Sequence, residues 1–203
     1  MKKTSLVLGF MLIMLLAMST SLMAITFTVT SINDTGSETA TEGKLSWAIT
    51  QSNISPSDDD IVFDLDSGST VTISGALPTI TDAVTIDGDD GGTAVTVQVT
   101  TPGTSTYRVF NINASDKTVN ISNMTIKGGD ISEQSGENSY GGSIYIKDAS
   151  VYISNCTITG SKAAYGGAIL VNELSGPFSL NNSTVSNSIA TFKGGGYVYS
   201  IVT

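Results

Sequence analysis

Few side chains in this chain of 203 residues could support catalysis or bind a metal. It contains no histidine, one cysteine (Cys156) and one arginine (Arg108). The lack of histidine excludes Ser-His-Asp and Cys-His catalysis and ligation of a metal through imidazole. A single cysteine cannot form an internal disulfide, so Cys156 is interpreted as a small residue within a repeat.

Two clusters of aspartate, residues 58–60 and 87–90, fall in stretches that we expect to be turns. The second is the one candidate for Ca²⁺, since the carboxylates of Asp87, Asp89 and Asp90 and nearby turn carbonyls would suit a hard cation. Its spacing matches neither the EF-hand loop nor the Gly-Gly-x-Gly-x-Asp repeat. Adjacent aspartates in turns are more often solvated, so we expect no metal, no cofactor and no catalytic residue.

The secondary structure that would position these side chains is indicated by an internal repeat. A ten-residue unit occurs at 119–128, 151–160 and, more loosely, 178–187, in steps of 32 and 27 residues. Apolar residues, Asn and Thr recur at equivalent places in each copy. A period of this length built from short strands is typical of a solenoid.

A second motif, a pair of glycines before an apolar residue, interleaves with the first in steps of 25 and 29 residues. Such a pair suits a tight bend or a close approach of two backbones. The paired glycines are Gly141 and Gly142, Gly166 and Gly167, and Gly195 and Gly196.

Alternation of apolar and polar residues predicts strands with one buried face, and no copy of the repeat has a helical period. We therefore predict an all-β fold, a right-handed single-stranded parallel β-helix, whose equivalent residues stack about 4.8 Å apart. Asn123, Asn155 and Asn182 should form a structural ladder of inward side chains at equivalent corners, each amide bonding the next. An antiparallel β-sandwich is the alternative, although sandwiches lack repeats in register.

Residues 25–66 are predicted to form an N-terminal cap on the β-helix domain 25–203. A short helix at about 43–53, with Leu45, Ala48, Ile49 and Ser52 on one face, would cover the open end of the core. Strands are expected near 25–31, 61–65, 70–74, 83–87, 94–100 and 108–112. The chain stops within a strand pattern at 197–203, so we expect a truncated C-terminus. Its open end, with Val198, Ile201 and Val202, would favour end-to-end self-association.

The first residues have the pattern of a secretory signal peptide: Lys2 and Lys3, an apolar run from Leu6 to Ala17, and small residues up to Ala24. We expect residues 1–24 to be removed and the rest to be secreted or displayed at the cell surface. That apolar run is too short for a membrane span. With 9 basic and 18 acidic residues the chain is acidic, which excludes nucleic acid as a natural partner.

Gly166-Gly-Ala-Ile169 resembles the repeat of right-handed parallel β-helix surface proteins of bacteria, including the polymorphic outer-membrane proteins. Gly141-Gly-Ser-Ile144 carries one change, Gly195-Gly-Tyr-Val198 matches loosely, and Phe110-Asn-Ile-Asn113 is the best counterpart of their companion Phe-x-x-Asn motif. The helix region Lys44–Ile49 and the strand after it also resemble the start of such proteins, without their arginine. The resemblance implies an adhesin-like surface protein of the outer membrane or an autotransporter.

From these features we expect a structural or adhesive role toward an extended protein or polysaccharide, and no enzyme activity. Tyr140, Tyr165 and Tyr197 flank the glycine pairs; packing at the corners is the favoured interpretation, and an exposed stripe for a ligand is the alternative. The alternative function is a polysaccharide lyase or glycoside hydrolase of the pectin-degrading β-helix type. The resemblance gives such lyases Ca²⁺ and a basic side chain, here Arg108, and inverting hydrolases need two carboxyls about 6.5–9.5 Å apart.

Overall fold

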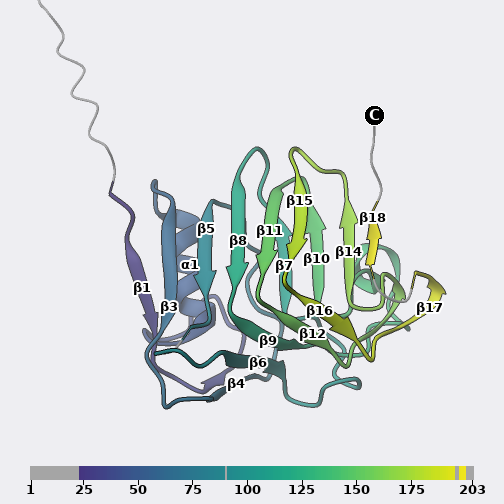
Figure 1. The fold of residues 1–203 in the computed structure, drawn as a ribbon, viewed down its shortest axis with the longest axis horizontal. Helices are drawn as coiled ribbons and strands as arrows, with labels where there is room; N and C mark the ends of the chain where they lie inside the picture. Colours follow the sequence, from purple (N-terminus) through teal and green to yellow (C-terminus); the bar gives the residue numbers. More distant parts are fainter. Residues whose placement is uncertain (1–22, 90, 195–196, 200–203) are drawn as a thin grey trace, which may run out of the picture.

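The alternating strands coil into a parallel β-solenoid of about five turns in a computed structural model (Figure 1). The structure describes residues 23–89, 91–194 and 197–199. Every pairing between its named strands is parallel, so the predicted parallel β-helix is confirmed. Most of the expected signal peptide, residues 1–22, lies outside the described residues, as do Asp90, Gly195, Gly196, Ile201 and Val202.

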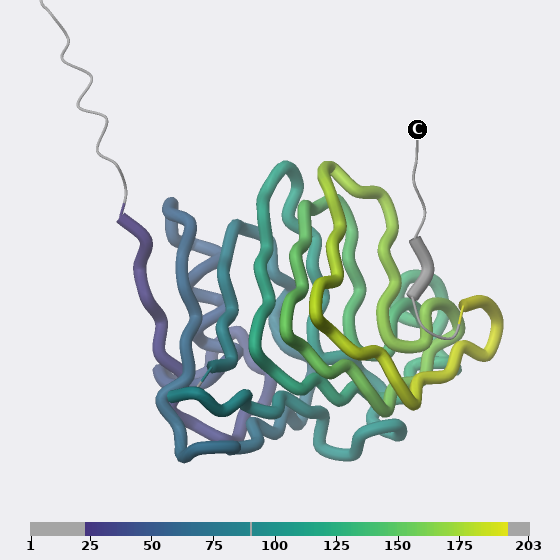
Figure 2. Tube along the Cα trace, viewed as in Figure 1, coloured from purple at the N-terminus to yellow at the C-terminus, as the bar shows by residue number. Residues whose placement is uncertain are grey.

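Three sheets run along the solenoid axis, and a tube view shows successive coils following one another from the N-terminal to the C-terminal end (Figure 2). The first sheet contains β1 (Thr26–Val29), β3 (Asp59–Phe63), β5 (Val84–Asp87), β8 (Thr118–Ser122), β11 (Ser150–Ser154) and β15 (Phe178–Asn181). The second contains β2 (Asn33–Asp34), β4 (Thr70–Ile73), β6 (Val95–Val99), β9 (Met124–Lys127), β12 (Thr157–Thr159) and β16 (Thr184–Ser186). The third contains β7 (Phe110–Asn113), β10 (Ile144–Lys147), β14 (Ile169–Asn172) and β18 (Tyr197–Tyr199).

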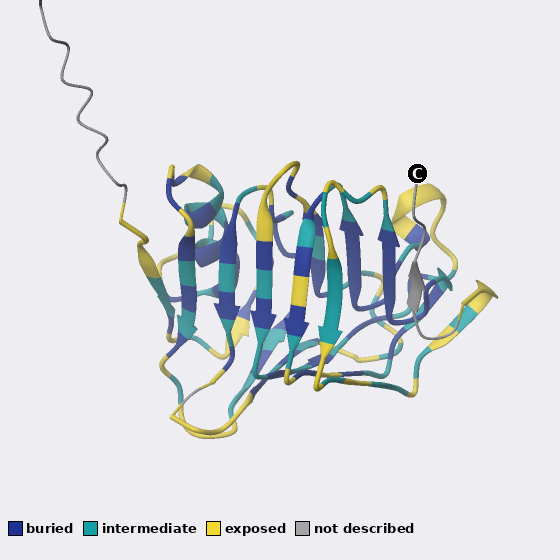
Figure 3. Cartoon of the chain, turned by 45° about the horizontal axis from the view of Figure 1, so that its top comes forward, coloured by how far each residue is buried: buried dark blue, intermediate teal, exposed yellow. Residues whose placement is uncertain are grey.

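Stacking of identical side chains builds the core. Val119 lies opposite Val151 and Ile121 opposite Ile153 in the register of β8 and β11, and all four are fully buried. Burying such a side chain contributes about 1.5–3 kcal/mol, which explains why the repeat keeps apolar residues there. Figure 3 shows the same alternation of buried and partly buried residues along the strands of the first sheet.

The two glycine pairs among the described residues, Gly141-Gly142 and Gly166-Gly167, occupy corners before the third sheet, as predicted. Gly141 and Gly166 have φ of 59° and 56°, in the left-handed region. Gly142 must lack a side chain for a different reason: an added Cβ would lie 2.5 Å from the carbonyl oxygen of Gly167. The third copy departs by one residue from the predicted alignment: Tyr197 pairs with Ile169, and Gly194, with φ of 72°, takes the equivalent of Gly166. The motif alignment was wrong there because Gly194 to Gly196 offer two possible glycine pairs.

Helix α1 (Leu45–Ile54) lies on the third side of the first coil, where the third sheet has no strand, and packs against β1 and β3 (Figure 1). The predicted apolar face is buried. The N-terminus of the helix is capped from a distance by Asp34 on β2. Its Oδ2 accepts the Ser46 backbone N–H at 2.7 Å, and its Oδ1 accepts the Ser46 hydroxyl at 2.6 Å. A carboxylate there complements the helix dipole.

Two parts of the fold differ from the sequence-based expectation. Asp59 and Asp60 begin strand β3 instead of forming a turn, and Asp59 is buried, accepting hydrogen bonds from the Ile25 backbone and the Ser57 hydroxyl. A short fourth sheet, β13 (Lys162–Tyr165) with β17 (Ile189–Lys193), was not predicted because its strands lack regular alternation. It forms where the chain passes from the second sheet to the third.

Candidate functional site

The candidate site lies at the corner where the chain leaves β6 of the second sheet and enters β7 of the third. The loop between them is held by Tyr107, whose hydroxyl donates to the Ile73 carbonyl at 3.0 Å. The next residue, Arg108, is half-buried and reaches the short 3₁₀ helix η1 (Gly136–Ser139), which precedes β10 in the following coil. Two adjacent coils therefore position the guanidinium.

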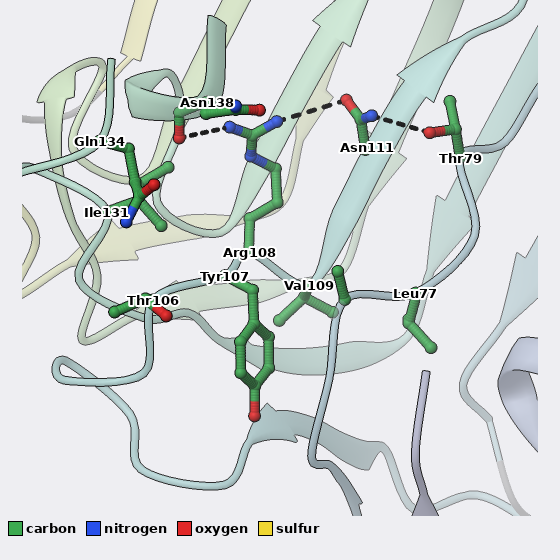
Figure 4. A pocket seen from close by; sticks show the side chains of 11 residues that line it. Leu77, Thr79, Thr106, Tyr107, Arg108, Val109, Asn111, Ile131, Gln134 and Asn138 are labelled. Atoms are coloured by element: carbon green, nitrogen blue, oxygen red, sulfur yellow. Dashed lines mark hydrogen bonds between the residues drawn. The ribbon is translucent and has the colours of Figure 1, made fainter. Parts of the chain in front are cut away.

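Arg108 makes three hydrogen bonds, all to neutral oxygens. Nη2 donates to the backbone carbonyls of Glu137 at 2.8 Å and Asn138 at 2.9 Å. Nη1 donates to Oδ1 of Asn111 at 3.4 Å, and the Asn111 amide in turn donates to the Thr79 hydroxyl at 2.8 Å. The buried Nε has no hydrogen-bond partner within the described residues. Figure 4 shows the guanidinium between Asn138 and Asn111.

A pocket of about 240 Å³ opens beside this guanidinium. Polar groups from three different coils line it, among them Thr79, Arg108, Asn111, Gln134 and Asn138 (Figure 4). No carboxylate belongs to its lining within the described chain. Burial lowers the pKa of Arg108 to about 10, because the cation loses hydration there and Coulombic interactions with Tyr145 and Glu137 offset that loss only in part.

An aromatic row runs from this pocket along the solenoid axis: Tyr145, Tyr140, Tyr165 and Phe192. Arg108 lies over the Tyr145 ring, 5.2 Å from its centroid, and Tyr145 is buried. Tyr140 and Tyr165 are partly buried with centroids 5.3 Å apart, and Tyr165 lies 5.2 Å from Phe192, which is 76% exposed. Tyr140 and Tyr165 thus pack at the corners and also leave a partly open aromatic surface, while the side chain of Tyr197 lies outside the described part of the chain.

The structure brings Asn123 and Asn155 together at left-handed corners between the first and second sheets. Their φ angles are 55° and 54°, and the Asn155 amide donates to Oδ1 of Asn123 at 3.0 Å. Asn123 donates onward to Oδ1 of Asp87 at 2.7 Å, which extends the ladder to the coil before. Asn182 occupies the equivalent corner with φ of 48°. The expectation of inward side chains was wrong: Asn155 and Asn182 are exposed, because the corner turns its Cβ away from the core.

The carboxylates of Asp87 and Asp89, two of the three calcium-candidate residues, accept hydrogen bonds from the chain itself. Oδ1 of Asp87 accepts hydrogen bonds from Asn123, from the Ser122 hydroxyl at 3.1 Å and from the backbone of Asp89 at 3.1 Å. Oδ1 of Asp89 accepts the Gly92 backbone N–H at 2.6 Å. Within the described residues no group of three potential metal ligands comes together. Arg108 and Asp87 lie at different corners, so the structure does not assemble them into one site.

Cys156 is buried at the repeat position shared by Met124, and burial raises the pKa of its thiol. The sequence analysis missed the pocket around Arg108 and the places of Tyr145 and Phe192 in the row. The only signal was that the one arginine of the chain lies two residues before a strand of the third sheet. Within the part of the chain that is described, no helix is long and apolar enough to cross a membrane.

No protein-family model, no curated protein and no solved structure matches this chain.

Proposed function

We propose that this chain is an exported structural and binding protein that presents one rigid face of a β-solenoid to an extended partner. The observation that carries the proposal is the aromatic row, in which Tyr140, Tyr165 and Phe192 come from three successive coils at intervals of 5.2–5.3 Å. This spacing is close to the strand spacing of about 4.8 Å, so the coil sets the distance between rings. A long stacked surface suits an extended polymer, a polysaccharide or a protein segment.

Export to the cell surface, of the kind found in adhesin-like proteins of bacteria, belongs to the same proposal. It is supported by the signal-peptide pattern of residues 1–24, by the acidic composition and by the resemblance of the Gly-Gly-Ala-Ile motif. N-terminal sequencing of the protein recovered outside a bacterial expression host tests it, and we expect the mature chain to begin at Ile25. Retention of the full-length chain inside the cells would contradict export.

Binding is tested by passing the protein over arrays of immobilised polysaccharides and matrix proteins. Phe192→Ser removes the most exposed ring of the row, and we expect it to weaken binding roughly tenfold, a loss of about 1.4 kcal/mol. Ile54→Ser is the matched control, because Ile54 is equally apolar and 72% exposed on α1, away from the row. Equal binding by both variants and the unchanged protein would refute a role for the row.

The rival function, degradation of pectin-like polysaccharides, is separated by an activity screen with and without Ca²⁺. We expect no turnover. Robust turnover that disappears in Arg108→Gln or Asp87→Asn would overturn the binding proposal.

A further inference from the structure

We infer that the pocket beside Arg108 binds a small hydroxylated carboxylate, a compound the size of a sugar acid. The first observation concerns the N–H donors of the Arg108 guanidinium. Arginine carries five N–H groups, and three of them bond neutral oxygens here. The Nη1 bond to Asn111 is long, at 3.4 Å, and a carboxylate oxygen entering the pocket would accept that proton better.

Within the described residues no carboxylate forms a salt bridge with Arg108, and the charge of Glu137 acts on it only without direct contact. The nearest carboxylate candidate, Glu137, contributes its backbone carbonyl to Arg108 while its Oε1 binds Nζ of Lys147 at 2.8 Å. Asp130 is likewise held by Lys162 at 3.0 Å. The groups in contact with this partly buried cation are carbonyls, an amide and the Tyr145 ring, so it loses hydration without a carboxylate in direct contact. An anion in the pocket supplies that contact.

The lining indicates what the rest of the ligand looks like. The amides of Asn111 and Gln134 and the hydroxyls of Thr79 and Thr106 offer both donors and acceptors, which suits hydroxyl groups on a ligand. The volume of about 240 Å³ lies below the range of about 300–1,000 Å³ for drug-sized ligands, so one small molecule or end group fits. A single guanidinium in a chain of net charge −9 matches one negative charge better than the two of a phosphate dianion.

This inference goes beyond the polymer-binding function and does not depend on it, because its test uses small molecules. Gluconate is the probe, sorbitol is the neutral compound of similar size and hydroxyl content, and inorganic phosphate is the alternative anion. Thermal unfolding and isothermal calorimetry are run in about 0.15 M NaCl, which screens weak surface binding. We expect a saturable rise in Tm and 1:1 binding with gluconate and neither with sorbitol. A sorbitol effect equal to that of gluconate, a phosphate effect equal to that of gluconate, or no effect of gluconate would each overturn the assignment.

Two variants test whether gluconate binds in the pocket beside Arg108. Arg108→Gln should abolish the gluconate effect, but it also removes the bonds to η1 and could disturb folding. Gln134→Glu avoids that problem, because Gln134 is exposed and the change brings a carboxylate into the pocket beside the guanidinium. We expect it to weaken gluconate binding at least about tenfold. Gln51→Glu makes the same chemical change on α1, outside the pocket, and should bind like the unchanged protein. Unaltered gluconate binding by Gln134→Glu would show that the ligand binds elsewhere.

Discussion

Replacing Asn155 tests how the corners of the solenoid are stabilised. Two effects act on this residue: its backbone is left-handed, with φ of 54°, and its amide donates to Asn123 at 3.0 Å. Left-handed backbone costs an ordinary residue about 1–2 kcal/mol, and Asn pays less because it visits this region readily. The side-chain hydrogen bond adds about 0.5–1.5 kcal/mol. Asn155→Ala incurs the backbone cost and also loses the hydrogen bond, so its free energy of unfolding should fall by about 1.5–3 kcal/mol.

Further substitutions at the same residue separate the two effects. Asn155→Gly loses the amide but adopts the left-handed backbone freely, so it should cost only about 0.5–1.5 kcal/mol. Because Asn155 is exposed, Asn155→Leu should cost about as much as Asn155→Ala, within roughly 0.5 kcal/mol. Gly160→Ala is the control for backbone strain alone, since Gly160 has φ of 71° and an added Cβ would meet no atom within 4 Å.

The measurement is urea unfolding followed by circular dichroism, with the free energies compared near the transition midpoint. Equal losses for Asn155→Gly and Asn155→Ala would refute the role of the left-handed backbone. An Asn155→Gly variant as stable as the unchanged protein would refute the role of the amide ladder.

Three further predictions concern packing, charge and the thiol. Gly142→Ala should lose about 1–3 kcal/mol of stability in the same urea assay, because its Cβ would lie 2.5 Å from the Gly167 carbonyl oxygen. The hydrogen bond from Lys147 lowers the pKa of Glu137 below 4.5, so its stabilisation is present above that pH and is lost as pH falls through the folded-state pKa. Urea midpoints of the unchanged protein and Lys147→Gln should therefore differ near pH 7 and converge once the pH falls below the folded-state pKa of Glu137; a constant difference would contradict this. Cys156 should resist a thiol reagent in the folded protein and react fully in urea, because it is 2% exposed and burial raises its pKa; rapid labelling of the folded protein would contradict its burial.

Much of the architecture follows from local pattern in the sequence. The alternation of apolar and polar residues, Val-x-Ile at 119 and 151 and Phe-x-Leu at 178, predicted both the strands and their register, because residues in equivalent positions stack on one another in a coil. The apolar face of α1 was likewise evident from the spacing of Leu45, Ala48 and Ile49. The strands and the apolar face of α1 depend on the spacing of residues close together in the sequence, so both can be recognised from the sequence alone.

The candidate site depends on contacts that no local pattern encodes. Arg108 meets the carbonyls of η1, 29 and 30 residues away, only because the next coil passes above it. Asp34 reaches Ser46 at the start of α1 because pairing of β2 with β4 holds that carboxylate in place. The sequence by itself determined a parallel solenoid with asparagine corners and paired glycines. Tertiary structure alone decided that Asn155 and Asn182 face outward and that the lone arginine lines a pocket without a salt bridge, since both depend on how separate coils come into contact.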